Sequence, residues 1–115
     1  MTDECIFCRI VAGEAPGDII YQDERFLAFS DISPQAPTHL LVIPKIHITS
    51  FAELTEGQQE LAGRLMMIAK NLAEKCGLAK SGYRLVINCG SEGGQVVPHL
   101  HLHLIGGRKL GGKLG

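Results

Sequence analysis

The chain has 115 residues, 45% of them hydrophobic, which is enough for one domain with one core but not for two independently folding units. Its net charge of −1 provides no basic field of the kind that nucleic acids or anionic membranes attract, so neither is expected as a partner. The N-terminus lacks a basic start followed by an apolar run, and no run reaches the length of a membrane span. We therefore expect a single cytoplasmic domain over residues 1–115, with reduced cysteines.

The first predicted element is a short helix. Residues 5–12 form an apolar stretch that ends at Gly13, and a helix there would place Cys5 and Cys8 on one face. Turn-rich pieces then separate runs that are typical of strands, at residues 19–22, 26–30 and 39–44.

One main helix follows these strands. Residues 55–58 form a capping-box pattern, and Gly77 supplies a stop signal. Between them, apolar residues recur at the spacing of one helix face, at Leu61, Leu65, Ile68 and Leu72. The pattern predicts an amphipathic helix that packs on a sheet.

Two more strands are predicted near the C-terminus, at residues 83–88 and 99–105. The sequence ends in a glycine-rich tail, residues 106–115, which we expect to be mobile unless a partner holds it. Strands in a run with one main helix inserted late indicate an α+β fold with a mostly antiparallel sheet of about five strands.

The most informative segment is residues 99–104, in which three histidines alternate with three leucines. On a strand this alternation sends the imidazoles to one face and the leucines to the other, so one face is core and the other a candidate site. Such a histidine row permits metal binding, or proton transfer and nucleophilic attack near neutral pH.

A glycine-rich loop, residues 89–95, precedes the histidines. Its Gly93 and Gly94 would let backbone amides approach an anion closely, and Gln95 adds side-chain donors. A plain hairpin loop would have a similar composition. The position beside the histidines favours a phosphate site.

Residues 99–105 resemble the signature of the histidine triad (HIT) family, in which histidines alternate with hydrophobic residues. Residues 31–39, 41–45, 94–95 and 106–108 are also similar to the Hint-type, nucleotide-binding branch. The resemblance implies one HIT domain and a homodimer whose two sheets join into one. It also implies hydrolysis of adenosine 5′-phosphoramidates or aminoacyl-adenylates, with release of AMP, and so a purine nucleoside monophosphate and its phosphoramidates as ligands.

The resemblance assigns the catalytic roles to three histidines. His101 would be the nucleophile that forms a nucleotidyl-histidine intermediate. His103 would contact the phosphate and help the leaving group depart, and His39 would orient the catalytic imidazoles. No catalytic metal is expected.

The nucleotide-binding residues that the resemblance implies fall into two groups. Asn88, Gly94, Gln95, His101 and His103 would contact ribose or phosphate, with Asp31 as the ribose-binding acid. Without the resemblance, the apolar residues of the second group would be read as core. They would form the slot around the base: Ile6, Phe7, Ile10, Phe29 and Ile32.

Two positions depart from the family pattern. Val96 stands where many relatives have a serine near the leaving group, and Pro98 stands where an aromatic residue often precedes the first histidine. Neither change touches His101, but Val96 removes a proton donor, so the leaving-group preference is open.

A second candidate site contains Cys5 and Cys8, whose C-x-x-C spacing suits two thiolates on one ion but also occurs by chance. Zinc-bearing members of the family combine two such cysteines with histidines at the positions of His47 and His99. The resemblance therefore implies a closed Cys2His2 zinc site with a structural role. Cys76 and Cys89 are interpreted as ordinary buried small residues.

Three alternatives to the phosphoramidase hypothesis remain open at this point. A dinucleoside polyphosphate hydrolase or nucleotidyl transferase would use the same nucleophile. A zinc-stabilised nucleotide-binding module would turn over little, and a metal carrier would use His99, His101 and His103 together.

Overall fold

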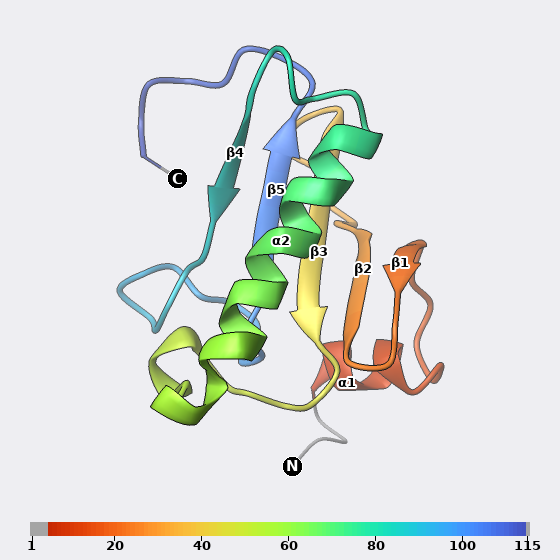
Figure 1. Cartoon of the computed structure of the whole chain (residues 1–115), viewed down its shortest axis with the longest axis vertical. Coiled ribbons are helices and arrows are strands. Elements are labelled where there is room, and N and C mark those ends of the chain that lie inside the picture. The colour runs from red at the N-terminus through yellow and green to blue at the C-terminus, as the bar shows by residue number, and fades with distance from the viewer. Residues whose placement is uncertain (1–4, 115) are drawn as a thin grey trace.

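A computed structural model describes residues 5–114 as a five-stranded antiparallel sheet with one long helix and one short helix (Figure 1). The strand order is β1-β2-β3-β5-β4. The strands are β1 (Ile19–Gln22), β2 (Phe26–Ser30), β3 (Thr38–Pro44), β4 (Tyr83–Val86) and β5 (Leu102–Gly106). The helices are α1 (Ile6–Val11) and α2 (Gln59–Lys75), with 3-10 turns at Phe51–Glu53 and Glu56–Gln58. The predicted α+β fold, with an antiparallel sheet and one main helix, is confirmed.

The main helix begins and ends as its sequence predicts. Thr55 and Gln58 form a capping box in the 3-10 turn that leads into α2. Gly77 follows the helix with a φ of +76°, a conformation that glycine adopts without the steric cost of a Cβ. The four apolar residues predicted on one face are all buried: Leu61, Leu65, Ile68 and Leu72.

The two faces of the sheet carry different cores. Alternate residues of β3 and β5, including Leu40, Val42, Leu102 and Leu104, pack with α2 in one cluster. Leu41 and Ile43 of β3 point to the other face and pack with Phe7 and Ile10 of α1. This second face also carries the histidines, because His101 lies edge-on to the Phe7 ring with 5.2 Å between ring centroids.

The last strand begins three residues later than predicted. Residues 99–101 precede β5 and do not join the hydrogen-bond ladder of the sheet. The Leu100 N–H donates instead to the Ile48 carbonyl at 2.6 Å. Predicted residues 87–88 likewise lie beyond the end of β4. The alternation nevertheless holds, because Leu100 joins the α2 core while His99 and His101 contact Phe7.

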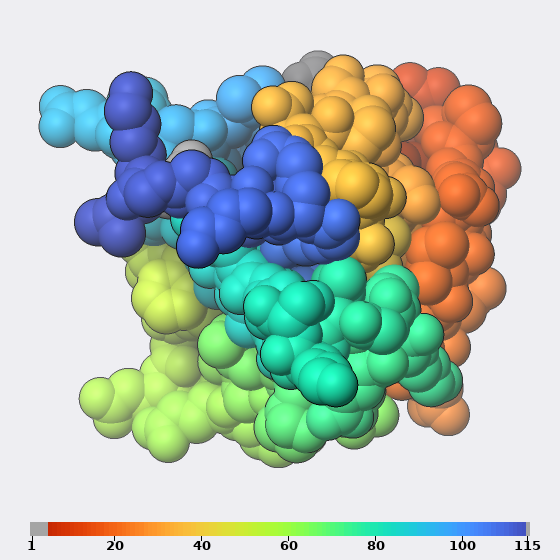
Figure 2. All heavy atoms as spheres, turned by 90° about the horizontal axis from the view of Figure 1, so that it is seen from above, coloured from red at the N-terminus to blue at the C-terminus, as the bar shows by residue number. Residues whose placement is uncertain are grey.

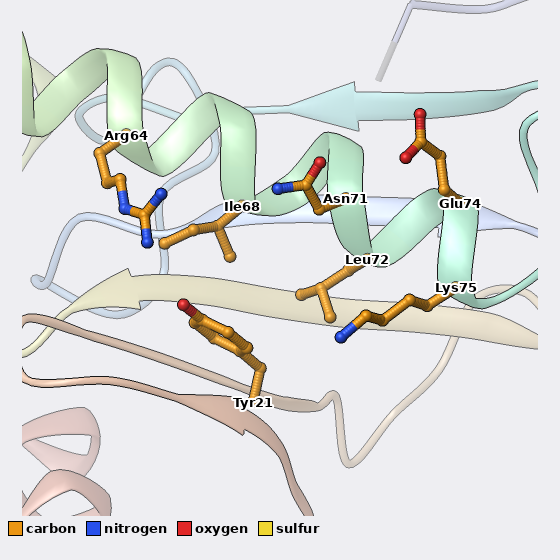
Figure 3. Close-up of a pocket in the computed structure, with 7 residues that line it drawn as sticks. All are labelled: Tyr21, Arg64, Ile68, Asn71, Leu72, Glu74 and Lys75. Atoms are coloured by element: carbon orange, nitrogen blue, oxygen red, sulfur yellow. The ribbon is translucent and has the colours of Figure 1, made fainter.

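A groove of about 460 Å³ lies on the α2 side, between that helix and the edge strand β1 (Figure 3). It is separate from the histidines, which lie on the opposite face of the sheet. Its lining residues are Tyr21, Arg64, Ile68, Asn71, Leu72, Glu74 and Lys75. Among residues 5–114, no helix combines the length and apolar character that crossing a membrane requires.

Two expectations about the C-terminal part need correction. Cys76 is exposed rather than buried, because it caps the end of α2, and Cys89 is only partly buried at the start of the glycine-rich loop. The tail begins later than predicted, since Gly106 belongs to β5. It also contacts its own chain, because Arg84 donates to the Gly111 carbonyl at 2.6 Å.

Candidate active site and metal-binding cluster

The two cysteines of α1 and two histidines form one cluster. Cys5 is the N-cap of the helix, and its sulfur accepts from the Cys8 N–H at 3.4 Å, which brings both sulfurs to one side. His99 Nδ1 lies 3.3 Å from Cys5 Sγ and 3.5 Å from Cys8 Sγ, and His47 Nδ1 lies 3.2 Å from Cys8 Sγ. One donor atom from each side chain falls within 4.8 Å of the others. The structure therefore brings together all four residues that the sequence suggested for a metal.

Hydrogen bonding orients the first triad histidine toward the sulfurs. His99 Nε2 lies 2.9 Å from the Pro44 carbonyl oxygen. A carbonyl can only accept, so Nε2 carries the hydrogen and Nδ1 offers its lone pair to the cluster. Histidines that bind a metal through one ring nitrogen typically donate a hydrogen bond from the other nitrogen.

Soft sulfur and imidazole donors in a four-membered set fit a tetrahedral transition metal such as zinc. Burial, reinforced by the neighbouring Cys5 thiol, raises the pKa of the Cys8 thiol to about 11. The free thiol is therefore protonated at neutral pH, and a metal bound there would release that proton.

His101 has one ring nitrogen committed to the backbone. Its Nδ1 lies 2.7 Å from the His99 carbonyl oxygen, so Nδ1 carries the hydrogen and Nε2 carries the lone pair. The residue is 6% exposed, and burial lowers the pKa of its imidazole from the ordinary value. A neutral imidazole with a free, oriented Nε2 lone pair is what nucleophilic attack requires.

His39 and His103 form a hydrogen-bonded pair beside His101. The Gln35 backbone N–H donates to His39 Nδ1 at 3.0 Å, which leaves the hydrogen of His39 on Nε2. That Nε2 lies 2.9 Å from His103 Nδ1, so His103 accepts there and carries its own hydrogen on Nε2. His103 can therefore donate a hydrogen bond from Nε2 while His101 attacks.

Asp31 completes this second cluster. Its Oδ2 lies 3.5 Å from His39 Nε2, and its Oδ1 accepts from the Ser33 N–H at 2.8 Å. Burial lowers the pKa of His103 to about 4, and the neighbouring imidazoles of His101 and His39 lower it further than Asp31 raises it. The imidazole of His103 is thus neutral well below pH 6.

The glycine-rich loop is folded on itself more tightly than the sequence suggests. The N–H groups of Gly93 and Gln95 donate to the Gly90 carbonyl, and that of Gly94 to Ser91. The side-chain amide of Gln95 donates to the Thr49 and Val97 carbonyls at 2.7 and 3.0 Å, so its donors are already used. A phosphate would bind the N–H groups of this loop only after these internal hydrogen bonds break.

The loop still depends on its glycines. A Cβ on Gly93 would clash with the Cys89 carbonyl oxygen, and Gly94 has a φ of +83°. Asn88 stabilises the same loop by donating to the Gly93 carbonyl at 2.8 Å. Val96 is 88% exposed beside it, so the position that departs from the family pattern lies at the surface.

The five apolar residues suggested for the base-binding slot lie in two environments. Phe7, Ile10 and Phe29 are buried together against the histidine face. Ile32 is 95% exposed and Ile6 is 41% exposed. The structure thus groups three of them and leaves two at the surface, where a ligand could cover them.

Sequence reasoning missed the backbone groups that fix the imidazoles. The carbonyls of Pro44 and His99 and the N–H of Gln35 set the ring tautomers, and no residue-type pattern identifies a backbone atom. The proline pair at residues 34 and 37 was the available signal, because it restricts the loop that presents Gln35.

Comparison with known proteins agrees with this geometry. The purine nucleoside phosphoramidase of Escherichia coli K12 is 48% identical over 111 residues, covering 96% of this chain and 93% of that protein. The crystal structure of a HIT family hydrolase from Legionella pneumophila matches with a TM-score of 0.95 and 48% identity, covering 97% of this chain and all of that one. A zinc-bound histidine triad family protein from Mycobacterium smegmatis has a TM-score of 0.84 and 36% identity, covering 100% and 82% of the two chains.

The family model of the HIT domain matches residues 12–110, which include every strand and all five histidines. The resemblance expected from the alternating histidines is therefore confirmed over nearly the whole chain. The chain belongs to the histidine triad (HIT) family.

Proposed function

We propose that this chain hydrolyses the P–N bond of purine nucleoside 5′-phosphoramidates, with aminoacyl-adenylates as related substrates, and releases AMP. The observation that carries the proposal is the tautomer of His101, whose Nδ1–H bonds a carbonyl and leaves Nε2 as a buried lone pair. The 48% identity to the E. coli purine nucleoside phosphoramidase supports the substrate class.

In the first step, His101 Nε2 attacks the α-phosphorus and the P–N bond breaks. The His103 Nε2–H donates a hydrogen bond to the departing nitrogen, and a water molecule supplies the proton, so the amine leaves neutral and hydroxide remains. His103 stays neutral and keeps its bond from His39 Nε2. The nucleotidyl-imidazolium on His101 keeps its Nδ1–H bond to the His99 carbonyl, which stabilises the positive charge.

In the second step, the hydroxide attacks the phosphorus and the bond between phosphorus and Nε2 breaks. AMP leaves, and both imidazoles are again in the neutral starting state. In this scheme Asp31 binds the ribose and Asn88, Gly94 and Gln95 lie along the nucleotide. The base occupies the apolar surface formed by Ile6, Phe7, Ile10, Phe29 and Ile32.

The proposed zinc ligands are Cys5, Cys8, His47 and His99. Four protein donors close a tetrahedral set, so the ion would supply structural rigidity and no open position for water. It would tie α1 to the segment that presents His101. The zinc-bound relative from M. smegmatis supports this choice of metal.

We also propose a homodimer with a continuous sheet. The strand order leaves β1 and β4 as the two edges, and β4 exposes Tyr83. Pairing of β4 with its copy would cover such an edge. Sedimentation at micromolar concentration should give the mass of two chains, and a single-chain mass would exclude the dimer.

The direct test follows AMP release from adenosine 5′-phosphoramidate by the wild type and by His101→Ala. We expect the variant to lose at least about 10³-fold in kcat while AMP affinity changes little. Lys109→Ala, an exposed change elsewhere, serves as the matched control. A wild type that binds AMP but releases none from this substrate would exclude the phosphoramidase function and favour a polyphosphate hydrolase or a binding module.

A further inference from the structure

The segment after β5 contacts the loop between β2 and β3 at two successive residues. Gly107 has a φ of +99°, and a Cβ there would lie 2.9 Å from Cβ of Pro37. Arg108 donates from Nη2 to the Gln35 carbonyl oxygen at 2.7 Å. Figure 2 shows the C-terminal segment, in dark blue, lying against the gold part of the chain that contains this loop. The segment therefore bonds Gln35 through Arg108 and leaves no room for a side chain between residue 107 and Pro37.

The same loop sets the tautomers of the catalytic pair. The Gln35 N–H is the donor to His39 Nδ1, and His39 Nε2 is in turn the donor to His103 Nδ1. If Gln35 moved away, His39 Nδ1 could carry the hydrogen instead, and His103 would lose the bond that keeps its own hydrogen on Nε2. The Gln35 N–H, together with the Asp31 carboxylate 3.5 Å from His39 Nε2, thus keeps the hydrogen of His103 on Nε2, where it can be donated to a ligand.

Arg108 is suited to holding this loop rather than to binding an anion. Its two hydrogen bonds go to backbone carbonyls, from Nη2 to Gln35 and from Nη1 to Lys109 at 3.0 Å. Within residues 5–114 it makes no ion pair with a carboxylate. A guanidinium spreads several donors over a fixed plane, so it can hold two carbonyls at once.

We propose that Arg108 is a positioning residue for hydrolysis: through the Gln35 carbonyl it keeps the Gln35 N–H directed at His39 and so keeps the proton of His103 on Nε2. This inference rests on the proposed function, in which the His103 Nε2–H donates a hydrogen bond to the leaving nitrogen. It assigns a role to the first residues of the glycine-rich tail, which are distant in sequence from His39.

The kinetic test compares two substrates of the Arg108→Ala variant. With adenosine 5′-phosphoramidate, whose amine needs a proton to leave, kcat should fall about tenfold while KM stays within about twofold. With the p-nitrophenyl ester of AMP, whose leaving group departs as a stable anion, kcat should be unchanged. Added guanidinium ion at millimolar concentration should restore part of the lost activity.

Two matched controls separate this effect from general damage to the tail. Arg84→Ala removes a different arginine-to-carbonyl bond, to Gly111, and Lys109→Ala removes a neighbouring charge. Both should hydrolyse the phosphoramidate at the wild-type rate. Gly107→Ala, which pushes on Pro37, should reproduce the Arg108→Ala selectivity between the two substrates.

A measurement without substrate decides the proposal independently of activity. Nitrogen-15 NMR of the imidazoles should show hydrogen on Nε2 of His39 and His103 in the wild type, and mixed tautomers in Arg108→Ala. Unchanged tautomers, or equal losses on both substrates, would overturn the positioning role. If the wild type fails to cleave the phosphoramidate, the proposed function fails, while the NMR result still tests whether Arg108 fixes the tautomer.

Discussion

Two histidine clusters lie at the ends of residues 99–103 and use histidine differently. The cysteine cluster contains Cys5, Cys8, His47 and His99, and the Asp31 cluster contains Asp31, His39 and His103. At the cysteine end, His99 is fully buried and both of its nitrogens are committed, one to the Pro44 carbonyl and one to the sulfurs. At the other end, His103 is only partly buried, and one nitrogen accepts from His39 while the other has no hydrogen-bond partner within residues 5–114. His99 and His103, which lie four positions apart, therefore differ in how many ring nitrogens are bonded within the protein.

This difference separates a structural histidine from one available for chemistry. A ring whose two nitrogens are both bonded must break one of these bonds to exchange a proton, whereas a ring with one free nitrogen need not. His101 lies between the two clusters and combines both properties, because its Nδ1 is held by the His99 carbonyl and its Nε2 is free. The cysteine cluster should therefore determine stability, and the Asp31 cluster should determine rate.

The largest effect should come from removing the metal-binding thiols. A Cys5→Ala/Cys8→Ala double variant should lose bound zinc, and its free energy of unfolding should fall by about 4 kcal/mol when the wild type is measured with zinc at roughly 1,000 times its Kd. Metal analysis and urea unfolding check both quantities. The exposed Cys76→Ala provides the control and should keep zinc and stability. If the double variant and the control unfold at the same urea concentration, the cysteine cluster is not a metal-dependent part of the fold.

A smaller effect is expected from the opposite cluster, and on rate rather than stability. Asp31→Asn keeps an oxygen that can accept from the Ser33 N–H but removes the negative charge 3.5 Å from His39. We expect kcat/KM for adenosine 5′-phosphoramidate to fall about tenfold, with unfolding changed by less than about 0.5 kcal/mol. Steady-state kinetics and urea unfolding of the same preparation make the measurement. If Asp31→Asn lowered stability without lowering kcat/KM, the Asp31 cluster would be a structural element rather than a catalytic one.

Sequence analysis predicted the elements whose signals are local. The bounds of β1 and β2 match the predicted residues 19–22 and 26–30, because turn residues mark both ends of each strand. The alternation at residues 99–104 also predicted correctly which side chains face α2. These signals lie within a few residues of the feature that they predict.

Features that depend on distant backbone atoms could not be predicted in this way. The segment before β5 leaves the strand because Leu100 bonds Ile48, fifty-two residues earlier in the chain. The side-chain amide of Gln95 donates to the Thr49 and Val97 carbonyls, and Arg108 bonds the Gln35 carbonyl across the fold. A carbonyl is present at every residue, so the sequence carries no mark of which one will be the partner.

The smallest expected effect concerns pH and tests whether His103 is neutral in the folded protein. Its pKa is lowered from 6.5 to about 4 by burial, so between these values the unfolded chain binds a proton that the folded chain does not. Stability linked to His103 is therefore complete above pH 6.5 and is lost as pH falls toward 4. Between pH 7 and pH 5, urea unfolding of the wild type should lose about 1 kcal/mol more than that of His103→Asn, allowing for partial solvent screening. Equal losses in the two proteins would mean that His103 titrates as an exposed histidine does. The contrast between His99 and His103 would then rest on their hydrogen bonds alone and not on burial.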